Sequence, residues 1–440
     1  MNNAPANRKG PSDGPSLAEA TRVWAKIGVT SFGGPAGQIA LMHRVLVEEQ
    51  RWIGEKQFLH ALNFCMLLPG PEAMQLATYV GWRLYGTIGG LAAGLLFVLP
   101  GAVIVLALSI AYALYGQVPA VEAAFVGIKA AVLVIVIEAL IRVARRALRG
   151  PYDVAIAAAS FVAIFFFAAP FPLIISAAAL IGYVHALAAR VPAPPPAAHP
   201  APVPLSQTLK TATLWLAIWI VPLLLLPVFF GPAHVMTDIA LFFSKLAVVT
   251  FGGAYAVLAY MAQQAVETYG WLTPGEMLDG LGLAETTPGP LILVTEFVGF
   301  LAGYRFGGEP RLAFGLLGAA VSLWATFAPC FLWIFTGAPY IERLTSNPRL
   351  NGALAGVTAA VVGVILNLSL WFALHVLFAK VDAVWHGPLR LWTPDVSSLS
   401  LEVVLLTILA AALLLVLRFG IVSTLAIAGA ASLAWWSLAS

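Results

Sequence analysis

The chain contains an internal repeat, and the repeated residues are helix breakers within apolar segments. Ser-Phe-Gly-Gly at residues 31–34 recurs as Thr-Phe-Gly-Gly at residues 250–253, and Pro-Gly-Pro at 69–71 recurs at 288–290. Both pairs are 219 residues apart (251 − 32 and 288 − 69). A duplicated apolar unit with interrupted helices is typical of secondary transporters, whose substrate sites lie at the interruptions.

The match extends beyond these motifs. The same offset aligns Glu19 with Asp238, Lys26 with Lys245, Met42 with Met261, Glu48 with Glu267 and Trp52 with Trp271. Further along, residues 127–132 pair with residues 356–361 at an offset of 229 (356 − 127). Two such units, each with an odd number of spans, would lie upside down relative to one another, and we favour this inverted arrangement.

A proline-rich stretch separates the two halves. Residues 191–204 consist largely of proline and alanine, and this composition cannot continue a helix. We therefore divide the chain into a polar N-terminal tail (1–16), a first repeat (17–190), a Pro/Ala-rich linker (191–206) and a second repeat (207–440).

The composition indicates an all-α polytopic membrane protein. Of 440 residues, 61% are hydrophobic and 10% are charged, whereas a soluble domain carries about 25% charged residues. A helix needs about 20 apolar residues to cross the bilayer, which predicts about 10 to 14 passes. The continuous candidates are 87–115, 120–141, 152–168, 171–189, 212–232, 309–336, 353–379, 400–417 and 419–437, and the interrupted ones are 17–48, 57–85, 236–265 and 276–304. A β-barrel is disfavoured because the apolar runs lack period-two alternation.

The basic residues predict the orientation in the membrane. Four arginines directly follow a predicted span, which is typical of a cytoplasmic flank: Arg142, Arg145, Arg146 and Arg149. Residues 1–16 hold no apolar stretch that could act as a signal peptide, so we expect the N-terminus on the cytoplasmic side.

The interruptions are candidate anion sites. Backbone groups in lipid must be hydrogen-bonded, so breaks survive at membrane depth only when they are buried in protein or face a wet cavity. Each break starts a new helix whose free N–H groups and dipole attract anions. Four such starts are predicted, after Gly34, Pro71, Gly253 and Pro290. The alternative is that these prolines only kink the helices for packing.

Two lysines accompany the glycine pairs. Lys26 and Lys245 each lie seven residues before the first glycine (33 − 26 and 252 − 245), on the same helix face. Ionisable residues within a membrane cost a few kcal/mol and usually face a functional cavity. The alternative for Lys26 is that it reaches the interface beside Arg22. Lys129 is a further candidate, although its repeat partner is Thr358.

Three acidic residues near the breaks are candidates for proton coupling: Glu72, Glu285 and Glu296. A carboxyl group that is desolvated near a cavity can titrate at working pH. Each could equally be an interface residue or the partner of a lysine or arginine. The amides of Gln38, Asn63 and Gln75 could donate to an oxyanion or bond between helices.

Other chemistries lack the residues they need. The sequence has no Gly-x4-Gly-Lys-Ser/Thr loop, its histidines show no paired ligand spacing, and its two cysteines lie in separate apolar segments. We therefore expect no metal, no cofactor and no nucleic-acid partner. An intramembrane enzyme acting on lipid is disfavoured because no nucleophile–base pair is visible.

The motifs resemble the chromate ion transporter family, in its long-chain form with two domains. The residues that carry the resemblance are Thr-Ser-Phe-Gly-Gly-Pro at 30–35 with Leu-Leu-Pro-Gly-Pro at 67–71, and Thr-Phe-Gly-Gly-Ala-Tyr at 250–255 with Ala-Glu-Thr-Thr-Pro-Gly-Pro at 284–290. The resemblance implies a multi-pass protein of the bacterial inner membrane that exports chromate with the proton gradient, sulfate being the natural look-alike. One departure is Glu-Ala-Met-Gln at 72–75, where small hydroxyl residues are expected.

These observations predict an alternating-access oxyanion transporter rather than an enzyme, with an anion channel of the same architecture as the alternative. Its partners would be the oxyanion and the lipid bilayer, and association into a homodimer is left open. The predicted substrate-binding residues are Lys26, Gly33, Gly34, Gln38, Pro69, Gly70, Pro71, Lys245, Gly252, Gly253, Thr286, Thr287, Pro288, Gly289 and Pro290.

Overall fold

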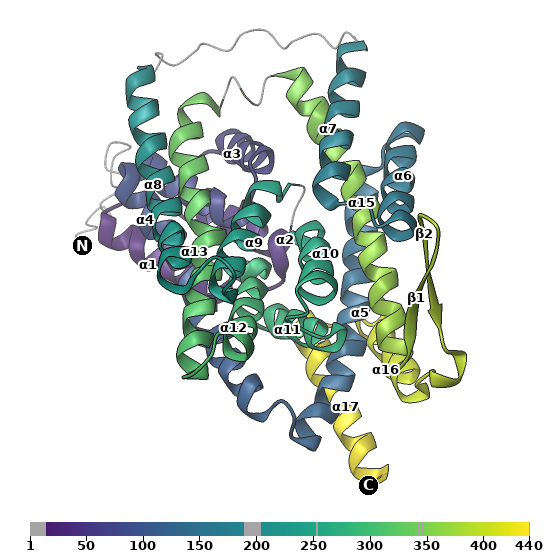
Figure 1. The fold of residues 1–440 in the computed structure, drawn as a ribbon. Coiled ribbons are helices and arrows are strands. Elements are labelled where there is room, and N and C mark those ends of the chain that lie inside the picture. The colour runs from purple at the N-terminus through teal and green to yellow at the C-terminus, as the bar shows by residue number, and fades with distance from the viewer. Residues whose placement is uncertain (1–14, 189–203, 252–253, 342–343, 345–346, 440) are drawn as a thin grey trace, which may run out of the picture.

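The computed structural model describes residues 15–188, 204–251, 254–341, 344 and 347–439. Among them, seven helices are long and apolar enough to cross a membrane. Helices dominate the fold (Figure 1), and buried side chains of both halves form one continuous core. The prediction of an all-α multi-pass membrane protein is confirmed. The predicted tail (1–16) and linker (191–206) fall largely outside the described residues, as do Gly252 and Gly253.

The first half contains eight elements before the linker. They are α1 (Leu17–Thr30), α2 (Gly34–His43), the π-helical turn η1 (Arg44–Glu49), α3 (Glu55–Leu67), α4 (Glu72–Tyr115), α5 (Pro119–Ala147), α6 (Pro151–Phe167) and α7 (Phe171–Ala188).

The second half follows the same order, with one additional helix at its start. The helices before its hairpin are α8 (Leu205–Phe230), α9 (Val235–Val249), α10 (Ala254–Gln263), the π-helical turn η2 (Gln264–Thr268), α11 (Pro274–Thr286), η3 (Leu291–Leu293), α12 (Val294–Phe306), α13 (Arg311–Gly337), η4 (Ala338–Tyr340) and α15 (Pro348–Leu377). The remaining elements are β1 (Val381–His386), β2 (Leu389–Pro394), η5 (Val396–Ser398), α16 (Leu401–Ala411), η6 (Ala412–Val416) and α17 (Ile421–Ala439).

The predicted breaks separate helices in both repeats. New helices begin at Gly34 and at Glu72, directly after Pro71, and their counterparts begin at Ala254 and at Leu291, directly after Pro290. The repeats also share the π-helical turns η1 and η2, which occupy equivalent positions after α2 and α10. Because π-helical turns are rare, their occurrence at equivalent positions supports the duplication.

α4 is a helical hairpin rather than one straight helix. Tyr85 and Gly86 have non-helical dihedral angles, with φ of −137° and 62°. A Cβ atom on Gly81 would lie 2.3 Å from the carbonyl oxygen of Gly89, which is possible only if the two arms fold back on each other. This turn agrees with the sequence analysis, which separated segment 57–85 from span 87–115.

The repeats interlock through their long helices. α7 packs against α15, where Gly182 contacts Gly352 and Ala178 contacts Gly356. α5 packs against α17 in the equivalent way, and a Cβ atom on Gly127 would lie 2.0 Å from the carbonyl oxygen of Ala428. Each repeat therefore completes its packing with helices of the other.

The two repeats are inverted, as predicted. Gly182 contacts Gly352 while Ala178 contacts Gly356, so α15 runs antiparallel to α7. In Figure 1, α7 lies toward the top of the molecule, whereas α17, its counterpart at the end of the second repeat, lies at the bottom beside the C-terminus. The equivalent helices α7 and α17 thus lie toward opposite ends of the molecule.

A β-hairpin interrupts the second repeat and was not predicted. β1 and β2 pair antiparallel, from Val381 opposite Pro394 to His386 opposite Leu389. The turn contains Gly387, whose φ of 61° favours glycine. The segment contains residues that favour strands, namely Val381, Val384, Trp385 and Trp392. It lies between two predicted spans and shows no helical periodicity.

Candidate functional site: an arginine-lined cavity beside crossed helix breaks

The interrupted helices of the two repeats meet in pairs. The Gly70 N–H donates to the Thr250 carbonyl at 2.9 Å, and the Gly289 N–H donates to the Ser31 carbonyl at 2.9 Å. Gly70 and Gly289 are repeat equivalents, as are Ser31 and Thr250, since each pair is 219 residues apart (289 − 70 and 250 − 31). The two bonds are therefore the same interaction made twice, as a two-fold relation between the repeats requires.

The backbone at both contacts requires glycine, and buried amides hold it in place. Gly70 has φ of 117° and Gly289 has φ of 96°, in the region that side chains rarely adopt. The Gln38 amide donates to the Gly289 carbonyl at 2.6 Å, and the Gln75 amide donates to the Pro69 carbonyl at 2.7 Å. Both glutamines belong to the first repeat, so the two breaks are supported asymmetrically.

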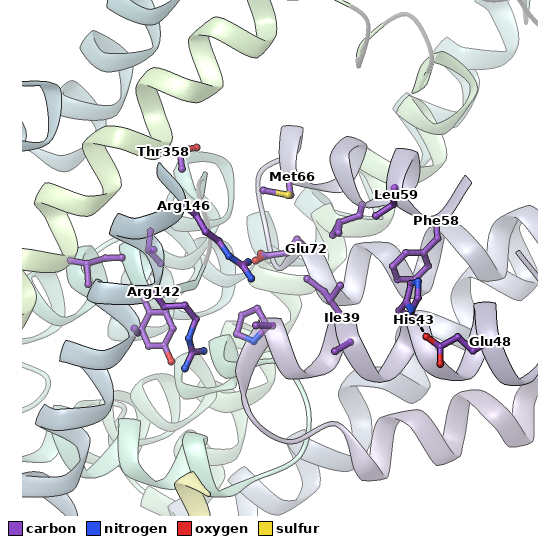
Figure 2. Close-up of a pocket in the computed structure, with 18 residues that line it drawn as sticks. Ile39, His43, Glu48, Phe58, Leu59, Met66, Glu72, Arg142, Arg146 and Thr358 are labelled. Carbon is purple, nitrogen blue, oxygen red and sulfur yellow. Dashed lines mark ion pairs between the residues drawn. The ribbon is translucent and has the colours of Figure 1, made fainter. Parts of the chain in front are cut away.

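A cavity of about 640 Å³ lies beside the first-repeat breaks (Figure 2). The starts of α2 and α4 contribute Pro35 and Glu72 to its wall, and the C-terminal half of α5 contributes Arg142 and Arg146. Much of the remaining lining is apolar, from α2 and α3. We call this space the arginine cavity.

Carboxylates balance the guanidinium groups. Arg142 donates to Glu138 one helical turn away at 2.5 Å, and its side chain is 38% exposed. In Figure 2 the Arg146 side chain points toward Glu72. Guanidinium groups bind planar or tetrahedral oxyanions through two parallel hydrogen bonds, so an anion that displaces these carboxylates would find a ready site.

Comparison with known proteins identifies the family. The family model for chromate transporters matches residues 18–183 and 237–435. The chain belongs to the chromate transporter family. It is 34% identical over 348 residues to the chromate transport protein of Pseudomonas aeruginosa, which covers 77% of each chain. It is 31% identical over 355 residues to the probable chromate transport protein of Synechococcus elongatus, covering 80% of this chain and 83% of that one. No solved structure matches the chain.

In this chromate transporter family member, the predicted glycines and prolines within the described residues lie at or beside the breaks where the two repeats meet. Gly34 lies close to the second repeat, because a Cβ atom there would be 3.9 Å from the Tyr255 hydroxyl. Gly33 has φ of 87° and precedes α2. Their roles as substrate ligands remain predictions.

The predicted threonines make hydrogen bonds within their own helix. The Thr286 hydroxyl donates to the Leu283 carbonyl at 2.8 Å, and the Thr287 hydroxyl donates to the Ala284 carbonyl at 3.0 Å. Both hydroxyl protons are therefore engaged in this conformation, and only the oxygen lone pairs are left to accept.

The predicted lysines lie on outward-facing sides of their helices. Lys26 on α1 and Lys245 on α9 are both exposed, and the Lys245 ammonium lies 5.9 Å from the centre of the Tyr260 ring. Neither lysine lines the arginine cavity. The structure thus places them apart from the arginines, and their contact with substrate stays a prediction.

The predicted acidic residues lie in three different settings. Glu72 lines the arginine cavity, and Glu285 is buried behind it, where its Oε1 accepts a hydrogen bond from Tyr255 at 2.9 Å. Glu296 on α12 is 1% exposed. Glu72 thus borders the cavity directly and Glu285 contacts it through Tyr255, whereas Glu296 is not among the lining residues.

The sequence analysis assigned Arg142 and Arg146 only to a cytoplasmic flank, yet they provide the positive charge of this cavity. Their spacing was the available signal. Arg142 and Arg146 are four residues apart and therefore lie on one helix face. They belong to a cluster of basic residues that by itself indicates only the membrane surface. The sequence alone could not show that α5 lines the same cavity as the starts of α2 and α4.

Proposed function

We propose that this chain is a secondary active transporter that exports chromate across the bacterial inner membrane, coupled to the proton gradient. Chromate binds in the arginine cavity, held by Arg142, Arg146 and the N–H groups at the starts of α2 and α4. The observation that carries the proposal is the pair of guanidinium groups beside two helix starts. Both features attract a dianion, and they come from different parts of the first repeat.

The orientation follows from the basic residues at the end of α5. Arg145, Arg146 and Arg149 support a cytoplasmic position for this end, because cytoplasmic flanks are enriched in lysine and arginine. The arginine cavity then faces the cytoplasm in this conformation, which suits an exporter that loads its substrate inside the cell.

The membrane potential favours this direction of transport. Each elementary charge is worth about 2.3 kcal/mol per 100 mV, so a dianion leaving a cell that is about 100 mV negative inside gains about 4.6 kcal/mol. The proton gradient supplies further driving force if a carboxyl group of the protein carries protons inward as the anion leaves. Sulfate is also a tetrahedral dianion, so the charge of the site alone does not exclude it.

The test is chromate flux in proteoliposomes that contain the purified protein. A transporter shows saturable uptake, counterflow of labelled chromate against unlabelled chromate, and accumulation driven by an imposed pH gradient. Parallel assays with sulfate give the selectivity. Counterflow without accumulation at any imposed gradient contradicts proton coupling.

A channel with the same architecture gives a different result. Its flux does not saturate at modest chromate concentrations and shows no counterflow, because no binding site alternates between the two faces. That outcome would replace the transporter proposal. Absence of any chromate or sulfate flux from folded protein would overturn both. Neither mechanism requires the homodimer that the sequence analysis left open, because the arginine cavity is built from one chain.

A further inference from the structure

A second cavity lies near the opposite end of α5. It has a volume of about 510 Å³ and is bordered by the end of α4, the first half of α5, α11 and the end of α12. Its lining is rich in polar and charged groups, whereas the arginine cavity is largely apolar apart from its arginines, Glu48, Glu72 and His43. Lys129 and Asp279 both line it, and their charged groups lie next to each other.

Asp279 is the buried carboxylate of this cavity. The residue is 4% exposed, and it lies in the middle of α11. The Tyr112 hydroxyl donates to its Oδ2 at 2.7 Å, and the Lys129 ammonium lies 3.8 Å from its Oδ1. A carboxylate held by one tyrosine and one lysine at the wall of a cavity can exchange a proton when either partner moves.

Two of the other charged groups around Asp279 are paired with each other. Glu276 and Arg305 form an ion pair with a shortest distance of 2.5 Å, one turn from Asp279. The titratable and charged groups that face the cavity are Tyr112 from α4, Glu122 and Lys129 from α5, Glu276 from α11, Tyr304 and Arg305 from α12, and Arg311 from α13. Within this set, Lys129 is the cation closest to the Asp279 carboxylate by the ion-pair distances.

The two cavities lie at opposite ends of α5, and α4 also lines both, with Glu72 in the arginine cavity and Tyr112 in the second. Along α5, Lys129 and Ala139 are the nearest lining residues of the two cavities, about 15 Å apart along the axis. The residues between them are buried from Ala130 to Val136. On α11, Asp279 belongs to one cavity, while Glu285 contacts Tyr255, which lines the other.

We propose that Asp279, with Lys129 and Tyr112, is the proton-binding site of the transporter, loaded from the face opposite the arginine cavity. This inference rests on the proposed function. In the conformation described, the anion enters from one face and the proton from the other. When the repeats exchange conformations, each site opens to the opposite face, so one proton enters as the anion leaves.

α11 provides the physical link between the two sites. Gly282 lies between Asp279 and Glu285, and a Cβ atom there would be 2.5 Å from the Ile128 side chain. This close packing against α5 means that α11 cannot shift at one site without shifting at the other. Proton binding at Asp279 changes the charge that Lys129 must balance, and so alters the contact between α11 and α5.

The test separates exchange from coupling. In proteoliposomes with equal pH on both sides, Asp279→Asn should keep chromate counterflow within about twofold of wild type. Under an imposed pH gradient, its chromate accumulation should fall by about tenfold or more, because the coupling resides in the lost proton site. Chromate-dependent proton flux, followed with a dye trapped in the vesicles, should fall in parallel.

Glu122→Gln is the matched control, since Glu122 lines the same cavity but is exposed. It should leave both counterflow and accumulation unchanged. Tyr112→Phe keeps the ring and removes only the hydroxyl that bonds to Asp279, so it should shift the pH dependence of accumulation without abolishing counterflow. This variant keeps the proposal testable if Asp279→Asn does not fold.

The outcomes are distinct. Accumulation by Asp279→Asn equal to wild type, or equal loss of counterflow and accumulation in well-folded Asp279→Asn and Tyr112→Phe proteins, overturns the proton site. Wild-type protein that shows no chromate counterflow instead overturns the proposed function, whatever Asp279 does.

Discussion

Equivalent glutamates in the two repeats have different surroundings. In the first repeat, Glu48 in η1 lies 3.2 Å from His43, its side chain is 61% exposed, and both residues line the arginine cavity. In the second repeat, Glu267 in η2 pairs with Arg390 at 3.1 Å, and the Arg390 side chain is only 6% exposed. The backbone is repeated, but one copy borders a cavity and the other anchors a buried cation.

The long helices show the same contrast. At the offset of 229, Arg142 and Arg146 of α5 correspond to Trp371 and His375 of α15 (371 − 142 and 375 − 146). The Trp371 and His375 rings lie 4.4 Å apart, and His375 lies 5.4 Å from the ring of Trp392 on β2. The first repeat places guanidinium groups beside a cavity, whereas the second fills the equivalent place with packed aromatic rings and a hairpin.

This difference teaches that the fold supplies two equivalent frames and that the side chains decide which one borders a cavity and which one is filled. The β-hairpin delivers Arg390 and Trp392 to the second frame and has no equivalent in the first. We therefore expect substitutions at equivalent positions to have unequal effects.

The largest effect is expected at the crossed breaks. Gly70→Ala should destabilise the protein by about 2–5 kcal/mol, because it combines an unfavourable φ with overpacking. The added Cβ would lie 2.7 Å from the Gln75 amide nitrogen. Gly289→Ala should cost less, since its Cβ would meet Leu293 Cδ1 at 3.1 Å. Thermal unfolding in detergent measures both. Gly54→Ala is the control, because Gly54 has φ of −75° and open space around it.

The next effect concerns the arginine cavity. Arg142→Gln should weaken chromate binding by about 30-fold or more, which corresponds to the roughly 2 kcal/mol or more lost when one partner of a charge-assisted contact is removed. Arg145→Gln is the matched control, because Arg145 lies on the same helix end but does not line the cavity. Chromate Km in proteoliposomes is the measurement. Equal Km values for the two variants would place the substrate elsewhere.

A smaller effect compares the two glutamates directly. Glu267→Gln should destabilise the protein by up to about 3 kcal/mol, because it leaves the buried Arg390 without its carboxylate. Glu48→Gln should change stability by less than about 1 kcal/mol, since exposed ion pairs contribute little. Melting temperatures of the two variants, measured side by side, decide the point. Equal shifts would show that the two frames are energetically alike.

The smallest effect is expected at the lysine predicted from the sequence. Lys245 is exposed on α9 and lies outside the arginine cavity, so Lys245→Gln should change chromate Km by less than about threefold, within 1 kcal/mol. A loss of transport as large as that of Arg142→Gln, at normal expression, would instead support the ligand role predicted for Lys245.

Much of the fold could be predicted because it follows from local chemistry. Prolines at 35, 71 and 290 and glycines at 34 and 70 predict interruptions whatever surrounds them, since proline lacks an N–H and glycine tolerates positive φ. The fixed offset of 219 predicts that the interruptions come in equivalent pairs. The β-hairpin was not predicted, because its strands are too short to show a periodicity when the sequence is searched for segments long enough to span a membrane.

The candidate site was less predictable. Glu72 and Glu285 were predicted from their position beside the breaks, and the structure places Glu72 on the cavity wall and Glu285 behind it. Arg142 is far from any break in sequence, whereas Asp279 lies only nine residues before Pro288 (288 − 279) but faces the cavity at the other end of α5. Both reach their sites only because α5 of one repeat packs against α11 of the other.

The sequence by itself therefore determined the membrane class, the duplication and the points where helices stop, because these depend on composition and on residues next to each other in the chain. Only the tertiary structure decided which break pairs with which, which charges face a cavity and which of two equivalent frames is filled. Those properties depend on contacts between residues more than a hundred positions apart, such as Gly70 with Thr250 and Tyr112 with Asp279. No local pattern encodes such contacts, because they form only when two inverted repeats pack against each other.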